Sequence, residues 1–205
     1  MARKRYSTSQ DRIKALGSLV GMNYTKKTCD NIKAFLEKYA YFKSDYNILN
    51  IDMTATDLWK EAPDLFAEMS SSTKINLDKI HIFLAVMIRT GQMDSLLDYS
   101  MKAVRSFEVD GEVYYKILYN LYFSDEILSD GAVELLCEYS HTTYHVKKKE
   151  AIMLFGITFW SKIYEHWDNS IEEMETIEES LGRDGSLSKG AKKLTAREQS
   201  EGKTK

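Results

Sequence analysis

The sequence predicts an all-α protein, a single bundle of six to eight helices, and three observations carry this prediction. The chain has one proline in 205 residues, Pro63, so few positions oblige the backbone to break, which favours long helices. Hydrophobic residues make up 43% and aromatic residues 12% of the chain, enough for a substantial core. Apolar residues recur at intervals of three and four along several segments, the spacing of one helix face. We therefore expect one helical domain over residues 1–181.

The N-terminal region predicts two helices separated by a glycine. A first helix over residues 10–20 is suited to a cap at Ser9 or Asp11, and Gly21 is suited to end it. A second helix, over about residues 28–41, carries its apolar residues on one face, as an amphipathic helix does. These apolar residues are Ile32, Phe35, Leu36 and Tyr39.

The middle of the chain contains the first of two predicted central helices. Residues 43–56 mix turn-forming and apolar side chains, and their structure is left open. Residues 57–69 have helical spacing, with Pro63 either in the first turn of a helix or as a break in one. Residues 77–90 are apolar around most of the helix circumference, and Gly91 is suited to end that helix. We expect the helix over residues 77–90 to be buried.

Residues 112–123 are the most ambiguous segment. An amphipathic helix over residues 93–107 and a turn at Asp110 and Gly111 precede them. Their aromatic and β-branched residues favour a strand. The spacing of three and four between their tyrosine and leucine side chains favours a helix, and no partner strand is evident. We predict a helix.

The second central helix is predicted over residues 145–167, after short helices that reach about residue 139. Its apolar segment, residues 151–160, is well short of the ~20 residues that span a bilayer, so we expect a buried core helix. An acidic helix is expected as far as residue 181. Residues 182–205 are rich in glycine, serine and lysine, which predicts a flexible basic tail.

Both ends of the chain are basic, whereas the body between them is acidic. Residues 1–27 contain seven basic side chains and one acidic one, and residues 182–205 contain seven basic and three acidic ones. Because the whole chain has a formal net charge of −3, the acidic excess lies between these ends. A short cationic segment is suited to hold a polyanion such as nucleic acid, an acidic protein or an anionic membrane surface.

The charge pattern predicts a non-catalytic interaction or regulatory protein. Its basic N-terminal segment and tail would engage an acidic partner, either an acidic protein or nucleic acid. The contacts would be made to phosphates or carboxylates and would not read base edges. The residues expected to make them are Arg3, Lys4, Arg5, Arg12, Lys14, Lys26 and Lys27.

Two alternative functions stay open. Residues 10–41 would form a helix-turn-helix with Lys26 and Lys27 at the start of the second helix, where DNA-reading side chains commonly lie. The protein would then be a sequence-specific DNA-binding regulator. In the other alternative, the acidic body of one chain meets the basic arms of another, and the protein is a self-assembling homo-oligomer.

Cys137, His141 and His145 form the sharpest site-like pattern, because their spacing is four and four. On one continuous helix they would share a face and offer three ligands to zinc. Thr142 and Thr143 are typical of a helix start, which would break that face, and no fourth ligand lies nearby in sequence. We therefore predict no metal site, and surface histidines near a buried cysteine.

The remaining sequence features favour an intracellular protein without enzymatic activity. No nucleophile accompanies a base in a recognisable motif, and no phosphate-binding glycine motif is complete, so we expect no cofactor and no small-molecule substrate. Cys29 and Cys137 lie too far apart in sequence to indicate a disulfide scaffold. The N-terminus lacks the apolar stretch of a signal peptide. We expect a reducing compartment, the cytoplasm.

Overall fold

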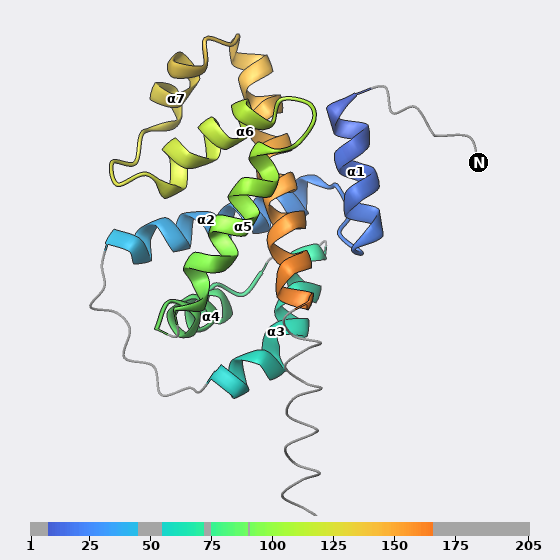
Figure 1. Cartoon of the computed structure of the whole chain (residues 1–205), viewed down its shortest axis with the longest axis vertical. Coiled ribbons are helices and arrows are strands. Elements are labelled where there is room, and N and C mark those ends of the chain that lie inside the picture. The colour runs from blue at the N-terminus through green and yellow to red at the C-terminus, as the bar shows by residue number, and fades with distance from the viewer. Residues whose placement is uncertain (1–7, 45–54, 72–74, 90, 166–205) are drawn as a thin grey trace, which may run out of the picture. The chain divides into compact units, whose positions relative to one another are not determined.

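A computed structural model describes residues 8–44, 55–71, 75–89 and 91–165, and these residues form helices and turns without a strand. If the π-helical segment η2 is counted as the end of α6, they contain helices α1 to α7 and one further helix over residues 141–165 (Figure 1). This confirms the predicted all-α bundle of six to eight helices.

Helices α1 (Ser9–Leu19) and α2 (Lys26–Ser44) form the predicted N-terminal pair. The cap of α1 is Thr8, one residue before the earlier of the two predicted candidates. Its hydroxyl accepts a hydrogen bond from the Asp11 main-chain N–H at 3.2 Å. Gly21 has a φ of 73° in the left-handed region that glycine tolerates, and α1 ends just before it, as predicted.

Helix α3 (Ala55–Ser70) contains Pro63 in its interior, beyond the first turn. A proline at this position lacks the N–H that would bond the carbonyl four residues earlier, so α3 has one main-chain hydrogen bond fewer than an uninterrupted helix. The part of α3 that follows Pro63 packs into the core through Leu65, Phe66 and Met69. Packing therefore maintains the helix through the proline.

Helix α4 (Leu77–Arg89) is buried along most of its length, as predicted for a central helix. Gly91 has a φ of 72°, and its N–H donates to the Ile88 carbonyl at 3.0 Å. Helix α5 (Gln92–Arg105) begins directly after this glycine and packs against α4. The buried side chains of α4 are Ile80, Phe83, Leu84, Ala85, Val86 and Met87.

The ambiguous segment is helical, as predicted, and forms α6 (Gly111–Leu118) and η2 (Tyr119–Phe123). The last turn widens to π-helical bonding, and the Ser124 N–H donates to the Tyr119 carbonyl at 2.8 Å. Helical spacing places the large side chains on one buried face, and this burial outweighs their modest strand preference. The buried residues are Tyr114, Ile117, Leu118, Leu121 and Tyr122.

A short helix and a sharp turn precede the second central helix. Helix α7 (Asp130–Cys137) is capped by Ser129, whose hydroxyl accepts from the Ala132 N–H at 3.3 Å. It ends at Glu138, which takes the left-handed conformation with a φ of 57°, an uncommon one for a residue other than glycine. The next helix starts at residue 141, earlier than predicted, and reaches the described limit at residue 165.

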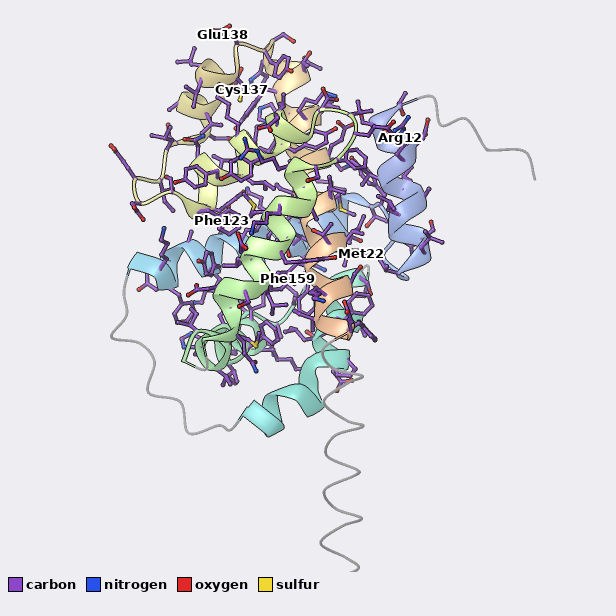
Figure 2. All side chains as sticks on the ribbon, viewed as in Figure 1. Arg12, Met22, Phe123, Cys137, Glu138 and Phe159 are labelled. Carbon is purple, nitrogen blue, oxygen red and sulfur yellow. The ribbon has the colours of Figure 1, made fainter. Side chains whose placement is uncertain are left out.

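The helix over residues 141–165 supplies the centre of the core. From residue 151 to residue 160 every side chain is buried except Thr158, which confirms the prediction of a buried helix there. Figure 2 shows Phe159 of this helix among the side chains that fill the bundle. Gly156 faces α2, where an added Cβ would overlap the side chain of Ile32, so the glycine permits a close approach of the two helices.

The ring of Trp160 contacts aromatic side chains of three other helices. Its ring centroid lies 5.9 Å from that of Phe35 in α2, and 6.1 Å from that of Phe66 in α3. The corresponding distance to Phe83 in α4 is 5.6 Å. Trp160 is 1% exposed, so these contacts form in the interior, where aromatic pairs add to the stability gained from burial.

Several predicted features lie outside the described residues. These are the end of the second central helix beyond residue 165, the acidic helix expected as far as residue 181, and the basic tail over residues 182–205. Within the part of the chain that the structure describes, no helix is both long and apolar enough to cross a membrane.

Candidate functional site

The predicted binding residues fall into three groups. Arg3, Lys4 and Arg5 lie outside the described residues. Arg12 forms an ion pair with Glu108, in the loop that connects α5 to α6, so its charge is engaged within the protein. Lys14, Lys26 and Lys27 belong to α1 and to the first turn of α2, and among described residues they form no ion pair.

Two lysines from distant parts of the chain meet at one tyrosine ring. The Nζ atom of Lys14 lies 5.8 Å from the ring centroid of Tyr24, and the Nζ atom of Lys149 lies 5.2 Å from the same centroid. Both distances fall within the range of cation–π attraction. We call Lys14, Tyr24 and Lys149 the lysine–tyrosine cluster. Sequence reasoning identified Lys14 but missed Lys149, which is 135 positions away.

The turn between α1 and α2 fixes Tyr24. The Met22 N–H donates to the Gly17 carbonyl at 2.8 Å, and the Met22 side chain is fully buried. On the other side of Tyr24, Thr25 accepts a hydrogen bond at its hydroxyl from the Thr28 N–H at 3.0 Å, which caps the start of α2. Anchors on both sides therefore hold the ring that the two lysines approach.

Substitution of Gly17 by alanine should disturb this turn. A Cβ on Gly17 would overlap the Met22 main-chain oxygen, and main chain cannot yield as a side chain can. We expect Gly17→Ala to lower the free energy of unfolding by about 1–3 kcal/mol, the usual cost of overpacking. Urea denaturation measures it. Gly131→Ala in α7 is the control, because nothing lies within 4 Å of its added Cβ, and it should raise stability by up to about 1 kcal/mol.

Cys29 lies near the cluster but is not suited to nucleophilic chemistry. Burial raises the pKa of its thiol to about 11, although the positive charge of Lys149 opposes that rise. The thiolate is therefore scarce at neutral pH. Burial likewise raises the pKa of Tyr24, with the negative charge of Glu150 adding to the shift, so the Tyr24 hydroxyl stays protonated and neutral.

The start of α2 departs from the arrangement that sequence-specific DNA reading requires. A recognition helix presents its first turns to the major groove. Lys26 and Asp30 are exposed there, but Thr28, Cys29 and Asn31 are buried against the rest of the bundle. The exposed face of the first two turns is thus narrow and carries a carboxylate, that of Asp30, as well as a cation.

A buried polar network fastens α1 and α6 to the central helix, and sequence reasoning missed it. The Tyr114 hydroxyl donates to the Glu150 carboxylate at 2.6 Å, and Lys147 Nζ lies 3.3 Å from the same carboxylate. Lys147 also donates to Asp110 at 2.6 Å, and Ser9 donates to Asp110 at 3.2 Å. Every member has a partner, so we interpret the network as structural.

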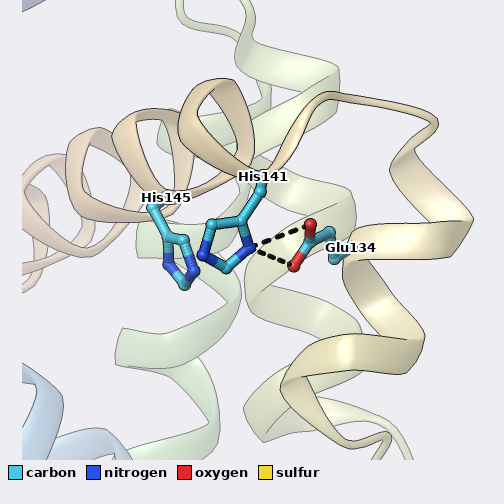
Figure 3. A group of neighbouring side chains, drawn as sticks. All are labelled: Glu134, His141 and His145. Atoms are coloured by element: carbon cyan, nitrogen blue, oxygen red, sulfur yellow. Dashed lines mark hydrogen bonds and ion pairs between the residues drawn. The ribbon is translucent and has the colours of Figure 1, made fainter.

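Cys137, His141 and His145 do not lie on one continuous helix, in keeping with the helix start expected near Thr142 and Thr143. Helix α7 ends at Cys137, the chain turns at Glu138, and the histidines belong to the next helix. The turn instead places Glu134 of α7 beside them, and the ligand atoms of Glu134, His141 and His145 all lie within 4.8 Å of one another (Figure 3). Cys137 is not part of this group.

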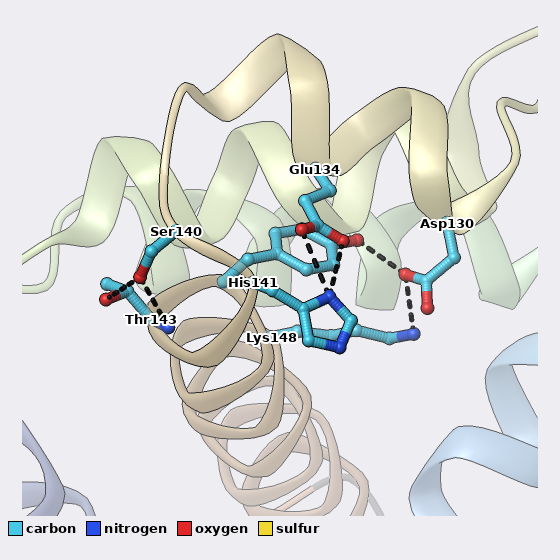
Figure 4. Close-up of polar contacts among 7 residues, drawn as sticks. Asp130, Glu134, Ser140, His141, Thr143 and Lys148 are labelled. Atoms are coloured by element: carbon cyan, nitrogen blue, oxygen red, sulfur yellow. Dashed lines mark hydrogen bonds and ion pairs between the residues drawn. The ribbon is translucent and has the colours of Figure 1, made fainter.

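Asp130 ties α7 to the next helix close to these histidines. Its carboxylate accepts hydrogen bonds from the Tyr144 hydroxyl at 2.5 Å and from Lys148 at 2.7 Å (Figure 4). Burial raises the pKa of Asp130, but the hydrogen bonds from Lys148 and Tyr144 lower it by more, so the net shift is downward. The carboxylate is therefore ionised at neutral pH.

No protein-family model matches the sequence, and comparisons with curated proteins and with solved structures found no significant match.

Proposed function

We propose that the protein is a non-catalytic helical module that binds nucleic acid through phosphate contacts, independently of sequence. The observation that carries this proposal is the convergence of Lys14 and Lys149 on the ring of Tyr24. The two cations come from opposite ends of the bundle's sequence, and among described residues neither is neutralised by a carboxylate in an ion pair. Such a pair attracts a polyanion.

The neighbouring start of α2 adds to this surface. Lys26 and Lys27 lie in its first turn, which contains no acidic residue; the first acidic residue of α2, Asp30, follows that turn and is exposed. The N-terminal end of a helix already carries a partial positive charge, so two lysines there are unfavourable unless an anion approaches. Arg3, Lys4 and Arg5 precede α1 in sequence and add three cations to the same terminal segment. A phosphate chain is suited to such an array of cations.

The tyrosine supports phosphate contact more than base stacking. Tyr24 is half-buried and its ring is near two lysine ammonium groups, so we assign it the role of positioning the cations. Phosphate contacts fix a protein on nucleic acid without conveying sequence. Clear preference among DNA sequences would instead support the helix-turn-helix alternative. A homo-oligomer that light scattering shows to dissociate as salt rises would support self-assembly.

Charge reversal at the cluster tests the proposal. Binding of fluorescent single- and double-stranded DNA and RNA of random sequence is followed across a salt series with the full chain. The double variant Lys14→Glu, Lys149→Glu loses two phosphate contacts. At ~0.1 M salt each lost contact should weaken binding about eightfold. The slope of log affinity against log salt concentration should also be shallower by about 2. The double variant Lys38→Glu, Lys102→Glu is the control, because it changes net charge equally at two other helical sites. An equal effect of both double variants would overturn the assignment of the cluster.

A deletion separates the cluster from the terminal arm. Removal of residues 1–7 deletes Arg3, Lys4 and Arg5 but leaves the Thr8 cap of α1 in place. We expect this deletion to weaken nucleic-acid binding and to leave the melting temperature unchanged. If the chain binds an acidic protein and does not bind nucleic acid, the partner is an acidic protein and the nucleic-acid proposal is wrong.

A further inference from the structure

We propose that Glu134, His141 and His145 bind one divalent late first-row transition ion, of the Zn²⁺ class. This site is independent of the nucleic-acid proposal. The three side chains come from two helices that the turn at Glu138 brings together, and their ligand atoms lie within 4.8 Å of one another. In Figure 3 the two imidazoles extend side by side from the later helix, and the Glu134 carboxylate faces His141.

The spacing of the ligand atoms is close to that of a tetrahedral zinc site. With metal–ligand bonds of about 2.0–2.1 Å, tetrahedral geometry places two ligand atoms ~3.3 Å apart. The Nδ1 atom of His141 already lies 3.1 Å from each carboxylate oxygen of Glu134. His145 is exposed and its ring centroid lies 4.3 Å from that of His141. Small rotations of the exposed His145 side chain would bring its ring nitrogen to the same spacing from the other two ligand atoms.

The protein scaffold holds the two ligand-bearing helices in place without a metal. The Ser140 hydroxyl accepts from the Thr143 N–H at 3.4 Å and marks the start of the helix that carries both histidines. Asp130, four residues before Glu134, bonds Tyr144 and Lys148 of that helix (Figure 4). Metal binding therefore does not have to order the two helices, and its ordering cost is confined to the three side chains.

The ligand set selects the kind of ion. Two imidazoles and one carboxylate suit zinc and its late first-row neighbours, whereas Mg²⁺ and Ca²⁺ prefer oxygen ligands alone. His141 and His145 are both exposed, so solvent reaches the site and water can fill the fourth coordination position. Three protein ligands with a water in the fourth position is an open site.

Calorimetric titration of the full chain with Zn²⁺ tests the site. We expect saturable binding of one ion per chain. Both Glu134→Gln and His145→Asn should weaken it by at least about tenfold, since loss of an outer-shell partner alone has that effect. Co²⁺ is a second probe, and its visible absorption should show the intense bands of tetrahedral coordination. Circular dichroism should show that both variants remain folded, because His145 lies at the surface and glutamine keeps the size and shape of the partly buried Glu134 side chain.

Two control variants make the ligand set specific. Glu126→Gln removes an exposed carboxylate outside the group, and Cys137→Ser tests the set that the sequence pattern indicated. Neither should change the affinity for Zn²⁺. The proposal would be overturned by the absence of saturable binding, by loss of binding in Cys137→Ser, or by equal affinity of His145→Asn and the unaltered chain.

Discussion

Trp160→Ala should lower the free energy of unfolding by about 3–5 kcal/mol, one of the two largest effects expected in this protein. The indole is 1% exposed and contacts aromatic rings of α2, α3 and α4, so its loss leaves a cavity where four helices meet. Those helices cannot all move to fill it, because each is also held by other core contacts. Denaturation in guanidinium chloride, followed by circular dichroism, measures the change.

Leu135→Ala is the matched control for the tryptophan substitution. Leu135 is a large apolar residue of α7, but it is 80% exposed. We expect a change within about 0.5 kcal/mol, as for most surface positions. If Trp160→Ala and Leu135→Ala cost similar amounts, the helix over residues 141–165 does not form the centre of the core.

Lys147→Met should lower the free energy of unfolding by up to about 3–5 kcal/mol, the cost of breaking a fully buried ion pair, because it removes the cation from a pair that is largely buried. The Lys147 side chain is 18% exposed and that of Glu150 is 5% exposed. Without the ammonium group, Glu150 keeps the hydroxyl of Tyr114 but loses its cation, and Asp110 loses the same cation. Methionine preserves most of the apolar stem, so the measured loss in denaturant reports the missing charge more than missing packing.

The surface pair of Lys102 and Asp98 provides the control for this charge effect. Their ion-pair distance is 2.6 Å, but both side chains are mostly exposed. Lys102→Met should change stability by less than about 1 kcal/mol, because solvent screens an exposed pair. A Lys147→Met variant as stable as Lys102→Met would show that the network around Glu150 contributes nothing to the fold.

The helices could be predicted because their evidence is local. The apolar run over residues 151–160 indicated a buried helix and is buried. The segment around Tyr119 was correctly predicted as helical from spacing, but nothing in the spacing indicated the π-helical turn that ends it. Local periodicity reports which face is buried and leaves the hydrogen-bonding register of one turn unspecified.

The sites were harder to predict because they depend on contacts between distant residues. Lys14 and Lys149 have no sequence pattern in common, and only the packing of α1 beside the central helix brings them to Tyr24. The neighbour of His141 and His145 is set by Glu138, which takes the left-handed conformation. Thr142 and Thr143 indicated that a new helix starts there, but Glu138 is not a glycine, so the sequence did not indicate the left-handed turn that places Glu134 beside the histidines.

We propose that the lysine–tyrosine cluster binds nucleic acid through phosphate contacts. The most direct test of this claim is the salt dependence of binding to random-sequence DNA and RNA, compared between the unaltered chain and the double variant Lys14→Glu, Lys149→Glu. We predict a salt slope shallower by about 2 in the double variant, with little difference among nucleic-acid sequences. An unchanged slope and affinity in a folded double variant would contradict the claim.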